Sequence, residues 1–139
     1  MTIEEIRRSF PNGFHDSDIL GIHIDYLRGE VIFLMDIDLS SPDMEVDEPN
    51  RTGELKLSGL LYCVIEPPDY SLAKEYVFCE DRLWIASDSS DFSLLKECPK
   101  LPEPIPDGGF RHWFFISGHN CFIYVAAMSA AFQWKDKPE

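Results

Sequence analysis

The chain has 139 residues, of which 45% are hydrophobic and 13% aromatic, a length and composition typical of one folded domain rather than a disordered chain. Its 25 acidic and 12 basic side chains give a formal net charge of −13, which argues against binding to nucleic-acid phosphates. The same charge attracts a basic protein partner.

The N-terminal residues 1–10 contain no apolar signal segment, and no run approaches the roughly 18 apolar residues of a membrane span. Four cysteines (Cys63, Cys79, Cys98 and Cys121) are too widely spaced for a paired zinc motif. We therefore expect a single domain over residues 1–139, cytoplasmic, with reduced cysteines and no membrane partner.

Residues 2–9 predict a short helix. Thr2 suits the N-cap position, and Glu5 follows three residues later as the partner in a capping box. Arg7 and Arg8 then lie near the C-terminal end, where positive charge is favourable.

Residues 14–39, FHDSDILGIHIDYLRGEVIFLMDIDL, predict a long β-hairpin. A two-residue turn at Arg28-Gly29 sets Ile22 opposite Met35. A slip by one residue would place the two apolar rows on opposite faces, so the alternation selects this register. The expected core face carries Leu20, Ile22, Ile24, Tyr26, Val31, Phe33, Met35 and Ile37.

The middle of the chain alternates loops with apolar runs. Residues 40–54 hold five acids and two prolines and predict a solvated loop without the ligand spacing of an EF-hand. Residues 55–66 predict a third strand whose second half is apolar on both sides, which favours a position in the middle of the sheet. Pro67-Pro68 ends this strand, because proline cannot donate to a β-ladder.

The next segments carry weaker signals. Residues 70–78 fit either a helical turn or a strand, and residues 82–87 predict a short strand. Residues 90–97 predict a short helix that is capped by Ser90. The proline-rich stretch 98–109 predicts a stiff surface connection, with a ligand for SH3-type domains as the alternative.

The C-terminal third returns to a strong β pattern. FRHWFFI (110–116) and CFIYVAAM (121–128) flank SGHN and predict a second hairpin that is covered on both faces. Alternation favours continued strand to residue 134. About six strands joined by short loops predict a mainly β fold (α+β with short helices), with an antiparallel sheet curled into a barrel-like or sandwich form.

His15, Asp16 and Ser17 form the one polar step that invites a catalytic interpretation. Adjacent residues on a strand point alternately away, however, and no G-x-S-x-G elbow occurs. We favour a structural interpretation, in which Asp16 or Ser17 caps a turn and His15 donates to a backbone carbonyl.

A metal or hydrolytic site would need other histidines to converge on His15 and Asp16. Neither an HxH nor an HxxxH pair occurs, so we expect no metal, no cofactor and no catalytic residue. Exposed aromatic side chains are typical of binding hot spots. The candidate binding residues are His15, Asp16, Asp25, Trp84, His112, Trp113, His119 and Asn120.

Three segments, NGFHDSDI, LSGLLYCVIEPPD and FFISGHNCFIYVAA, resemble a family of small uncharacterised bacterial proteins. That family opens with a His-Asp-Ser/Ala step, carries a central apolar strand ending in Glu-Pro-Pro, and has an Asn before a late apolar strand. The matching positions are His15, Asp16, Glu66, Pro67, Pro68 and Asn120. Some members resemble immunity proteins of polymorphic toxin systems, which are single-domain inhibitors, and the resemblance implies no catalytic residues.

We therefore expect a non-catalytic acidic binding protein, an immunity-like inhibitor of a basic, toxin-like protein. The first alternative is a metal-dependent or hydrolytic enzyme that uses His15 and Asp16 with other histidines. The second is a homodimeric scaffold whose aromatic face forms the dimer contact.

Overall fold

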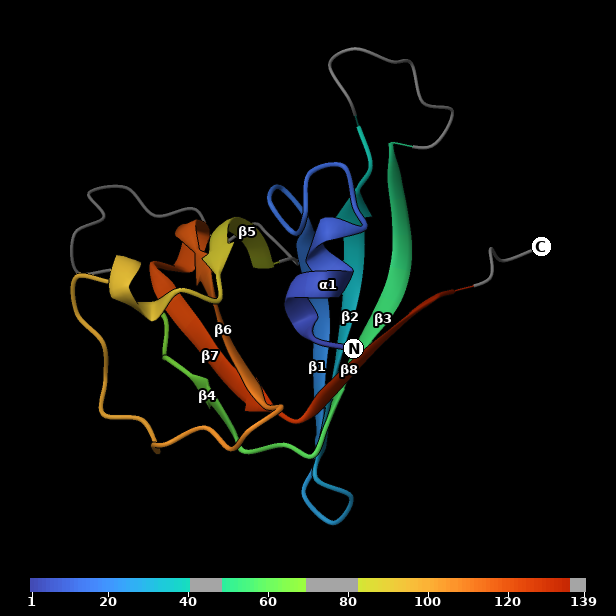
Figure 1. Cartoon of the computed structure of the whole chain (residues 1–139). Coiled ribbons are helices and arrows are strands. Elements are labelled where there is room, and N and C mark those ends of the chain that lie inside the picture. Colours follow the sequence, from blue (N-terminus) through green and yellow to red (C-terminus); the bar gives the residue numbers. More distant parts are fainter. Residues whose placement is uncertain (41–48, 70–82, 136–139) are drawn as a thin grey trace.

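The protein, seen in a computed structural model that describes residues 1–40, 49–69 and 83–135, is built mainly of antiparallel strands with one short helix (Figure 1). The strand order is β4-β7-β6-β5-β1-β2-β3-β8 in one open sheet of eight strands, so the expected antiparallel fold is confirmed in its sandwich-like form. The elements are α1 (Ile3–Arg8), β1 (Asp18–Asp25), β2 (Glu30–Asp38), β3 (Asn50–Ser58), β4 (Tyr62–Ile65), β5 (Leu83–Ser89), the 3₁₀ turn η1 (Phe92–Leu94), β6 (Phe110–Ile116), the 3₁₀ turn η2 (Ser117–His119), β7 (Cys121–Ala127) and β8 (Ser129–Trp134).

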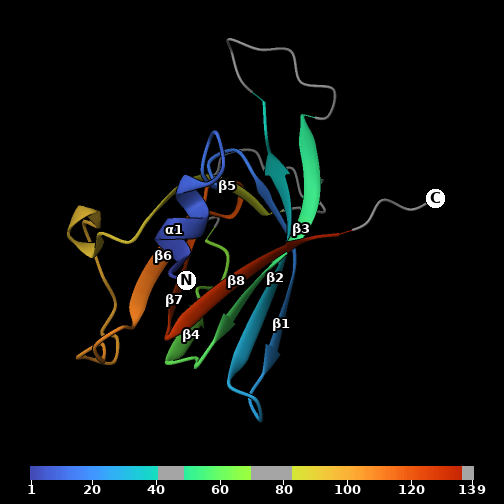
Figure 2. The same cartoon turned by 45° about the vertical axis from the view of Figure 1, so that its right-hand side comes forward.

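Two predicted strands each bend and divide, which raises the strand count above six. β3 passes into β4 through residues 59–61, and β7 passes into β8 through Met128. The bends adjoin, because the Met128 N–H lies 3.1 Å from the carbonyl oxygens of both Ser58 and Gly59. This corner separates a first half-sheet (β1, β2, β3 and β8) from a second half-sheet (β4, β7, β6 and β5), as Figure 2 shows.

The first hairpin forms, but with a longer connection than the sequence predicts. Residues 26–29 join the strands, so that Asp25 pairs with Glu30 and Ile22 with Phe33. The expected two-residue turn at Arg28-Gly29 is therefore wrong. The longer loop is stabilised locally, since the Arg28 N–H donates to Asp25 Oδ1 at 3.1 Å and Gly29 adopts a φ of +64°.

The predicted core face of this hairpin is confirmed on β2, where Val31 and Phe33 are fully buried. On β1 the pairing shifts between Ile19 and Gly21, which turns Ile19 inward in place of the expected Leu20. Tyr26 lies in the connecting loop with 85% of its surface exposed, so its predicted place on the core face is also wrong.

Two apolar clusters hold the fold together. The first lies between the half-sheets and α1, and its largest fully buried side chains include Phe14, Phe33 and Phe114. The second lies on the outer face of the second half-sheet, where residues 92–105 cover it. It consists of Tyr62, Phe92, Trp113, Tyr124 and Ala126, with Leu95, Leu101 and Ile105 packed against it.

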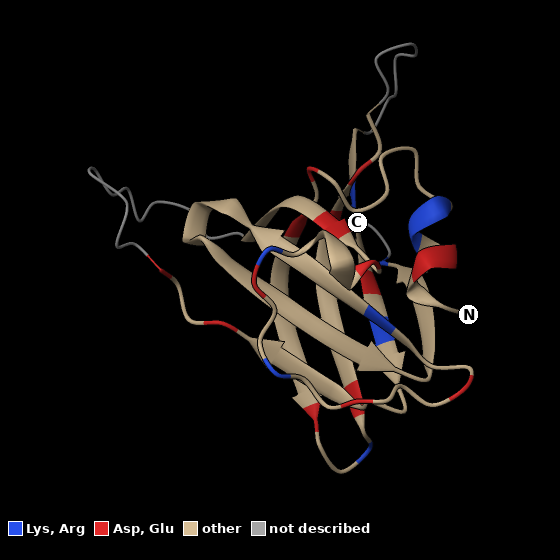
Figure 3. Cartoon of the chain, turned by 60° about the vertical axis from the view of Figure 1, so that its left-hand side comes forward, with Lys and Arg blue, Asp and Glu red and all other residues tan. Residues whose placement is uncertain are grey.

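The covering segment includes the proline-rich stretch, which runs over the surface of the domain as predicted. Its Leu101 and Ile105 contact the second cluster, and the strands below are largely uncharged (Figure 3). The hairpin of β6 and β7 is therefore covered on both faces, as predicted. The predicted mid-sheet position of residues 55–66 holds for β3, which lies between β2 and β8, but is wrong for β4, which is the end strand of the order and leaves Ile65 45% exposed.

Local signals at the helices are confirmed in part. The Thr2 side chain accepts from the Glu5 N–H at 3.2 Å and caps α1. The helix predicted over residues 90–97 is only the single 3₁₀ turn η1, and its cap is Asp91 rather than Ser90. The helix ends after one turn because Leu95 is already in an extended conformation, with φ −80° and ψ 131°.

Some predictions concern residues that lie outside the described part of the chain. These are the segment 70–78, Cys79, the acidic residues 41–48 and the tail from residue 136. β3 begins at Asn50, inside the segment that was predicted as loop to residue 54. Within the described ranges, no helix has the length and apolar character needed to cross a membrane.

Gly59 provides a test of the corner. We expect Gly59→Ala to lower the free energy of unfolding by roughly 3 kcal/mol, because a side chain there is strained at φ +62° and its Cβ would lie 2.8 Å from Met128 Cβ. Gly108→Ala is the matched control, with a φ of +83° and open space around it, and should cost only about 1 kcal/mol. Urea denaturation measures both, and equal losses would contradict the proposed role of the corner.

Candidate functional site

A buried polar network links the helix to the second half-sheet. His112 on β6 is fully buried, and its Nε2 lies 2.6 Å from Asp88 Oδ2 on β5. The same carboxylate oxygen accepts from Arg7 Nε at 2.9 Å, while Ser90 Oγ lies 2.7 Å from His112 Nδ1. We call Arg7, Asp88, Ser90 and His112 the polar quartet.

The polar quartet contains the residue types of a nucleophilic triad. Such chemistry needs space for a substrate beside the serine and donors that stabilise an oxyanion. Ser90 lines neither of the two hollows described below. Asp88 is shared with the Arg7 guanidinium, which is about one third exposed, and this ion pair holds the N-terminal helix on the sheet.

The sequence pointed to His112 but missed its partners. Asp88 lies near the end of β5 and Ser90 follows the strand directly. This spacing of two was the available signal, because residues two apart on a strand share a face. Asp88 Oδ1 is buried and accepts no hydrogen bond from the described residues.

His15 and Asp16 lie at the entrance to β1 and contact each other. His15 Nδ1 is 3.2 Å from Asp16 Oδ2, and both side chains are about half exposed, at 56% and 43%. Asp16 has a φ of +63°, typical of a turn, and its N–H donates to the Ile85 carbonyl. Ser17 Oγ accepts from the Asp38 N–H at 3.0 Å, a bond that ties the start of β1 to the end of β2 in place of the predicted local cap.

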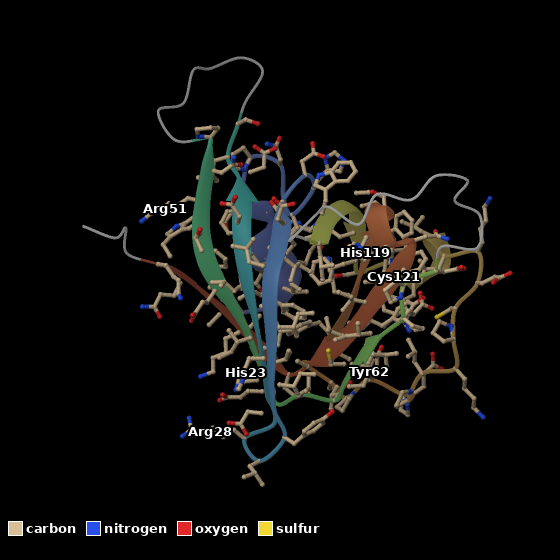
Figure 4. The ribbon with its side chains drawn as sticks, turned by 180° about the vertical axis from the view of Figure 1, so that it is seen from behind. His23, Arg28, Arg51, Tyr62, His119 and Cys121 are labelled. Carbon is tan, nitrogen blue, oxygen red and sulfur yellow. The ribbon has the colours of Figure 1, made fainter. Side chains whose placement is uncertain are left out.

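The other histidines are distributed over both half-sheets. His23 lies on the exposed face of β1, whereas His119 lies in η2 beside β7 (Figure 4). Both ring nitrogens of His112 are engaged inside the polar quartet. In the described ranges, no three His, Cys, Asp or Glu side chains come together as metal ligands.

The remaining predicted residues have separate settings. Asn120 adopts a left-handed conformation at φ 47°, as expected of a turn residue between β6 and β7. Trp84 on β5 is 40% exposed. Trp113 is nearly buried in the second cluster, where its Nε1–H donates to the Asp91 carbonyl at 3.0 Å.

The outer face of the first half-sheet is open and acidic. Because Val31 and Leu55 point into the core, their strand neighbours point outward. Pairing places Asp18 opposite Asp36 and Asp25 opposite Glu30. The outward charged side chains of β1, β2 and β3 are Asp18, Asp25, Glu30, Asp36, Asp38, Glu54 and Lys56.

An apolar hollow of about 380 Å³ lies at the centre of this acidic face. Gly21 creates the hollow, because it has no side chain to fill the space above Leu34. A Cβ added at Gly21 would lie 4.0 Å from Leu34 Cβ, which is ordinary contact distance. Its lining residues are Gly21, Ile22, His23, Ile32, Leu34 and Glu54. An apolar centre with a charged rim is the anatomy of a protein-binding patch.

A second hollow of about 460 Å³ lies on the outer face of the second half-sheet. Its floor is aromatic, with the Phe115 and Phe122 rings 4.9 Å apart and the Trp113 and Phe122 rings 5.8 Å apart. Lys96 and Glu97 provide one charge of each sign at its margin. The hollow can therefore accept an apolar group but shows no strong preference for charge.

Glu66 has a structural position at the end of β4. Its Oε1 accepts from the Phe122 N–H at 2.8 Å, and its backbone N–H donates to the Phe122 carbonyl. Burial, together with this carboxylate, raises the pKa of the Tyr124 hydroxyl. Burial alone raises the pKa of the Cys63 thiol to about 11, which leaves it a poor nucleophile at neutral pH.

Comparison with known proteins gives little information. No family model matches the chain, and no curated protein matches it. Among solved structures, the chain is similar to an uncharacterized protein from Neisseria gonorrhoeae, with a TM-score of 0.47 and 14% identity over 86% of this chain and 92% of the other. That similarity carries no argument about activity or partners.

The polar quartet should act on stability. We expect Asp88→Ala to lower the free energy of unfolding by roughly 3 kcal/mol, because it leaves the buried His112 and the Arg7 guanidinium without their shared acceptor. Asp107→Ala, at an exposed loop carboxylate, should cost less than about 0.5 kcal/mol. Urea unfolding of both variants measures the difference, and similar costs would show that the network is not a structural tie.

The cysteines should differ in reactivity. At pH 8 we expect iodoacetamide to alkylate the exposed Cys98 well before Cys63, whose thiolate fraction is about 0.1% at the raised pKa. Alkylation of Cys63 should accelerate about tenfold per pH unit toward pH 11. Peptide mapping by mass spectrometry follows each site, and a plateau for Cys63 near pH 9 would show that burial does not control it.

Proposed function

We propose that this protein is a non-catalytic binding protein that captures a basic protein partner on the outer face of its first half-sheet, in the manner of a small immunity-like inhibitor. The observation that carries the proposal is the apolar hollow at Gly21, Ile32 and Leu34 surrounded by carboxylates. Interfaces commonly combine an apolar centre with a polar rim that sets orientation and specificity.

The charge pattern supports a partner of positive charge. The outward charged side chains of β1, β2 and β3 comprise six carboxylates and one lysine, even though Asp25 and Glu30 each have a cation nearby. A basic surface placed against this face would be attracted by that excess of negative charge. The net charge of −13 would also increase the rate of encounter with such a partner.

The hollow provides the apolar contact that would slow dissociation, which charge alone does not provide. Long-range attraction increases association rates, whereas desolvated apolar contacts set most of the dissociation rate. Gly21 leaves room for one apolar side chain of the partner between Ile32 and Leu34. We therefore expect the acidic rim and the apolar hollow to affect different kinetic constants.

The enzymatic alternative has weaker geometric support. It requires His15 and Asp16 to act with other histidines, but His112 is fully buried and contacts Asp88 and Ser90. His15 is half exposed and contacts its neighbour Asp16.

The test uses purified protein and each basic protein encoded by an adjacent gene. We expect one of them to form a stable complex at low ionic strength, with an association rate that falls steeply as salt is added. Gly21→Leu should fill the hollow and raise the dissociation rate by about tenfold or more. Glu54→Gln should instead lower the association rate, and surface plasmon resonance separates the two effects.

Asp107→Asn is the matched control, because it removes an exposed carboxylate outside the acidic face. It should leave both rates nearly unchanged. Absence of any complex at low ionic strength, or a complex that Gly21→Leu and Glu54→Gln leave intact, would end the proposal.

A further inference from the structure

We propose that a second copy of this chain docks on the tip of the first hairpin, so that two molecules associate tip to tip about a two-fold axis. The tip is the loop of residues 26–29 between β1 and β2, at the far end of the first half-sheet (Figures 1 and 4). This self-association is separate from the binding of a basic partner to the acidic face.

The tip carries two adjacent apolar side chains that are almost fully exposed. Leu27 is 101% exposed and Tyr26 is 85% exposed, the highest values among the large hydrophobic side chains of the described residues. The adjoining corner exposes Leu61 and Met128, at 37% and 38%. An apolar patch on a charged surface is typical of a contact site.

The loop is held in place and is therefore preorganised for binding. The Arg28 N–H donates to Asp25 Oδ1 at 3.1 Å, and Gly29 supplies the φ of +64° that the turn needs. The Leu60 N–H donates to the Gly29 carbonyl at 2.9 Å, which ties the loop to the corner. A loop ordered before binding loses less conformational entropy in the complex.

Local charge identifies the occupant. Each carboxylate at this end has its own cation, since Arg28 Nε lies 3.8 Å from Asp25 Oδ2 and Lys56 Nζ lies 3.3 Å from Glu30 Oε1. The tip is thus balanced on a chain of net charge −13. A basic protein gains little there, whereas another acidic molecule can approach without repulsion.

The arrangement of the two charges in the loop also suits a two-fold contact. In an isologous interface the same surface meets itself, so each group must find its complement on an identical loop. Asp25 and Arg28 lie three residues apart and carry opposite charges, which allows each Arg28 to face the Asp25 of the other copy. Tyr26 and Leu27 lie between these two charged residues in the chain. In the dimer they pack against Tyr26 and Leu27 of the other copy.

The test is analytical ultracentrifugation of the purified full chain at moderate ionic strength. Because the contact is small, we expect a monomer–dimer equilibrium with a Kd on the order of 100 µM. Leu27→Asp should raise the Kd by about tenfold or more, since it places a charge in the centre of the contact. Arg28→Asp should weaken the dimer, and Arg28→Lys should largely preserve it.

Leu94→Asp is the matched control, because Leu94 is an exposed leucine (64%) of the second half-sheet's cover and should not affect dimerisation. All variants alter exposed positions, and unchanged urea midpoints will show that they fold. A wild type that stays monomeric to several times the expected Kd would overturn the proposal. So would dimerisation that survives Leu27→Asp, dimerisation lost through Leu94→Asp, or a monomer whose Leu27 binds phosphatidylcholine vesicles.

Discussion

The corner at which two strands bend together determines the architecture of this protein. Gly59 has a backbone conformation that favours glycine and lies too close to Met128 to carry a side chain. Two hydrogen bonds from the Met128 N–H hold the bends in register. Because β3 and β7 both change direction there, one antiparallel sheet becomes two facing halves with an enclosed core.

The two half-sheets are covered differently, and that difference separates structural surfaces from candidate binding surfaces. Residues 92–105 cover much of the outer face of the second half-sheet, and α1 packs at the core between the halves. The outer face of the first half-sheet keeps its acidic rim and the hollow at Gly21 exposed. The function proposed above uses this face, because its carboxylates surround an apolar centre.

The polar quartet shows why residue types alone do not identify an activity. Ser90, His112 and Asp88 are connected as in a hydrolase, yet the histidine is fully buried and the aspartate also accepts from Arg7. The same chemistry that activates a nucleophile in an open cleft fixes a helix to a sheet in a closed core. Placement therefore decides between the two roles.

The sequence by itself determined the strands of the two hairpins, the buried face of β2, the cap at Thr2 and the turn at Asn120, because alternation and capping depend on neighbours within a few residues. It also identified His112 and Asp25 as candidates. Only the tertiary structure decided the shift at Leu20, the corner at Gly59, and the partners of His112. Each of these features forms between segments that are far apart in the chain. A local sequence pattern does not show which distant segments come into contact.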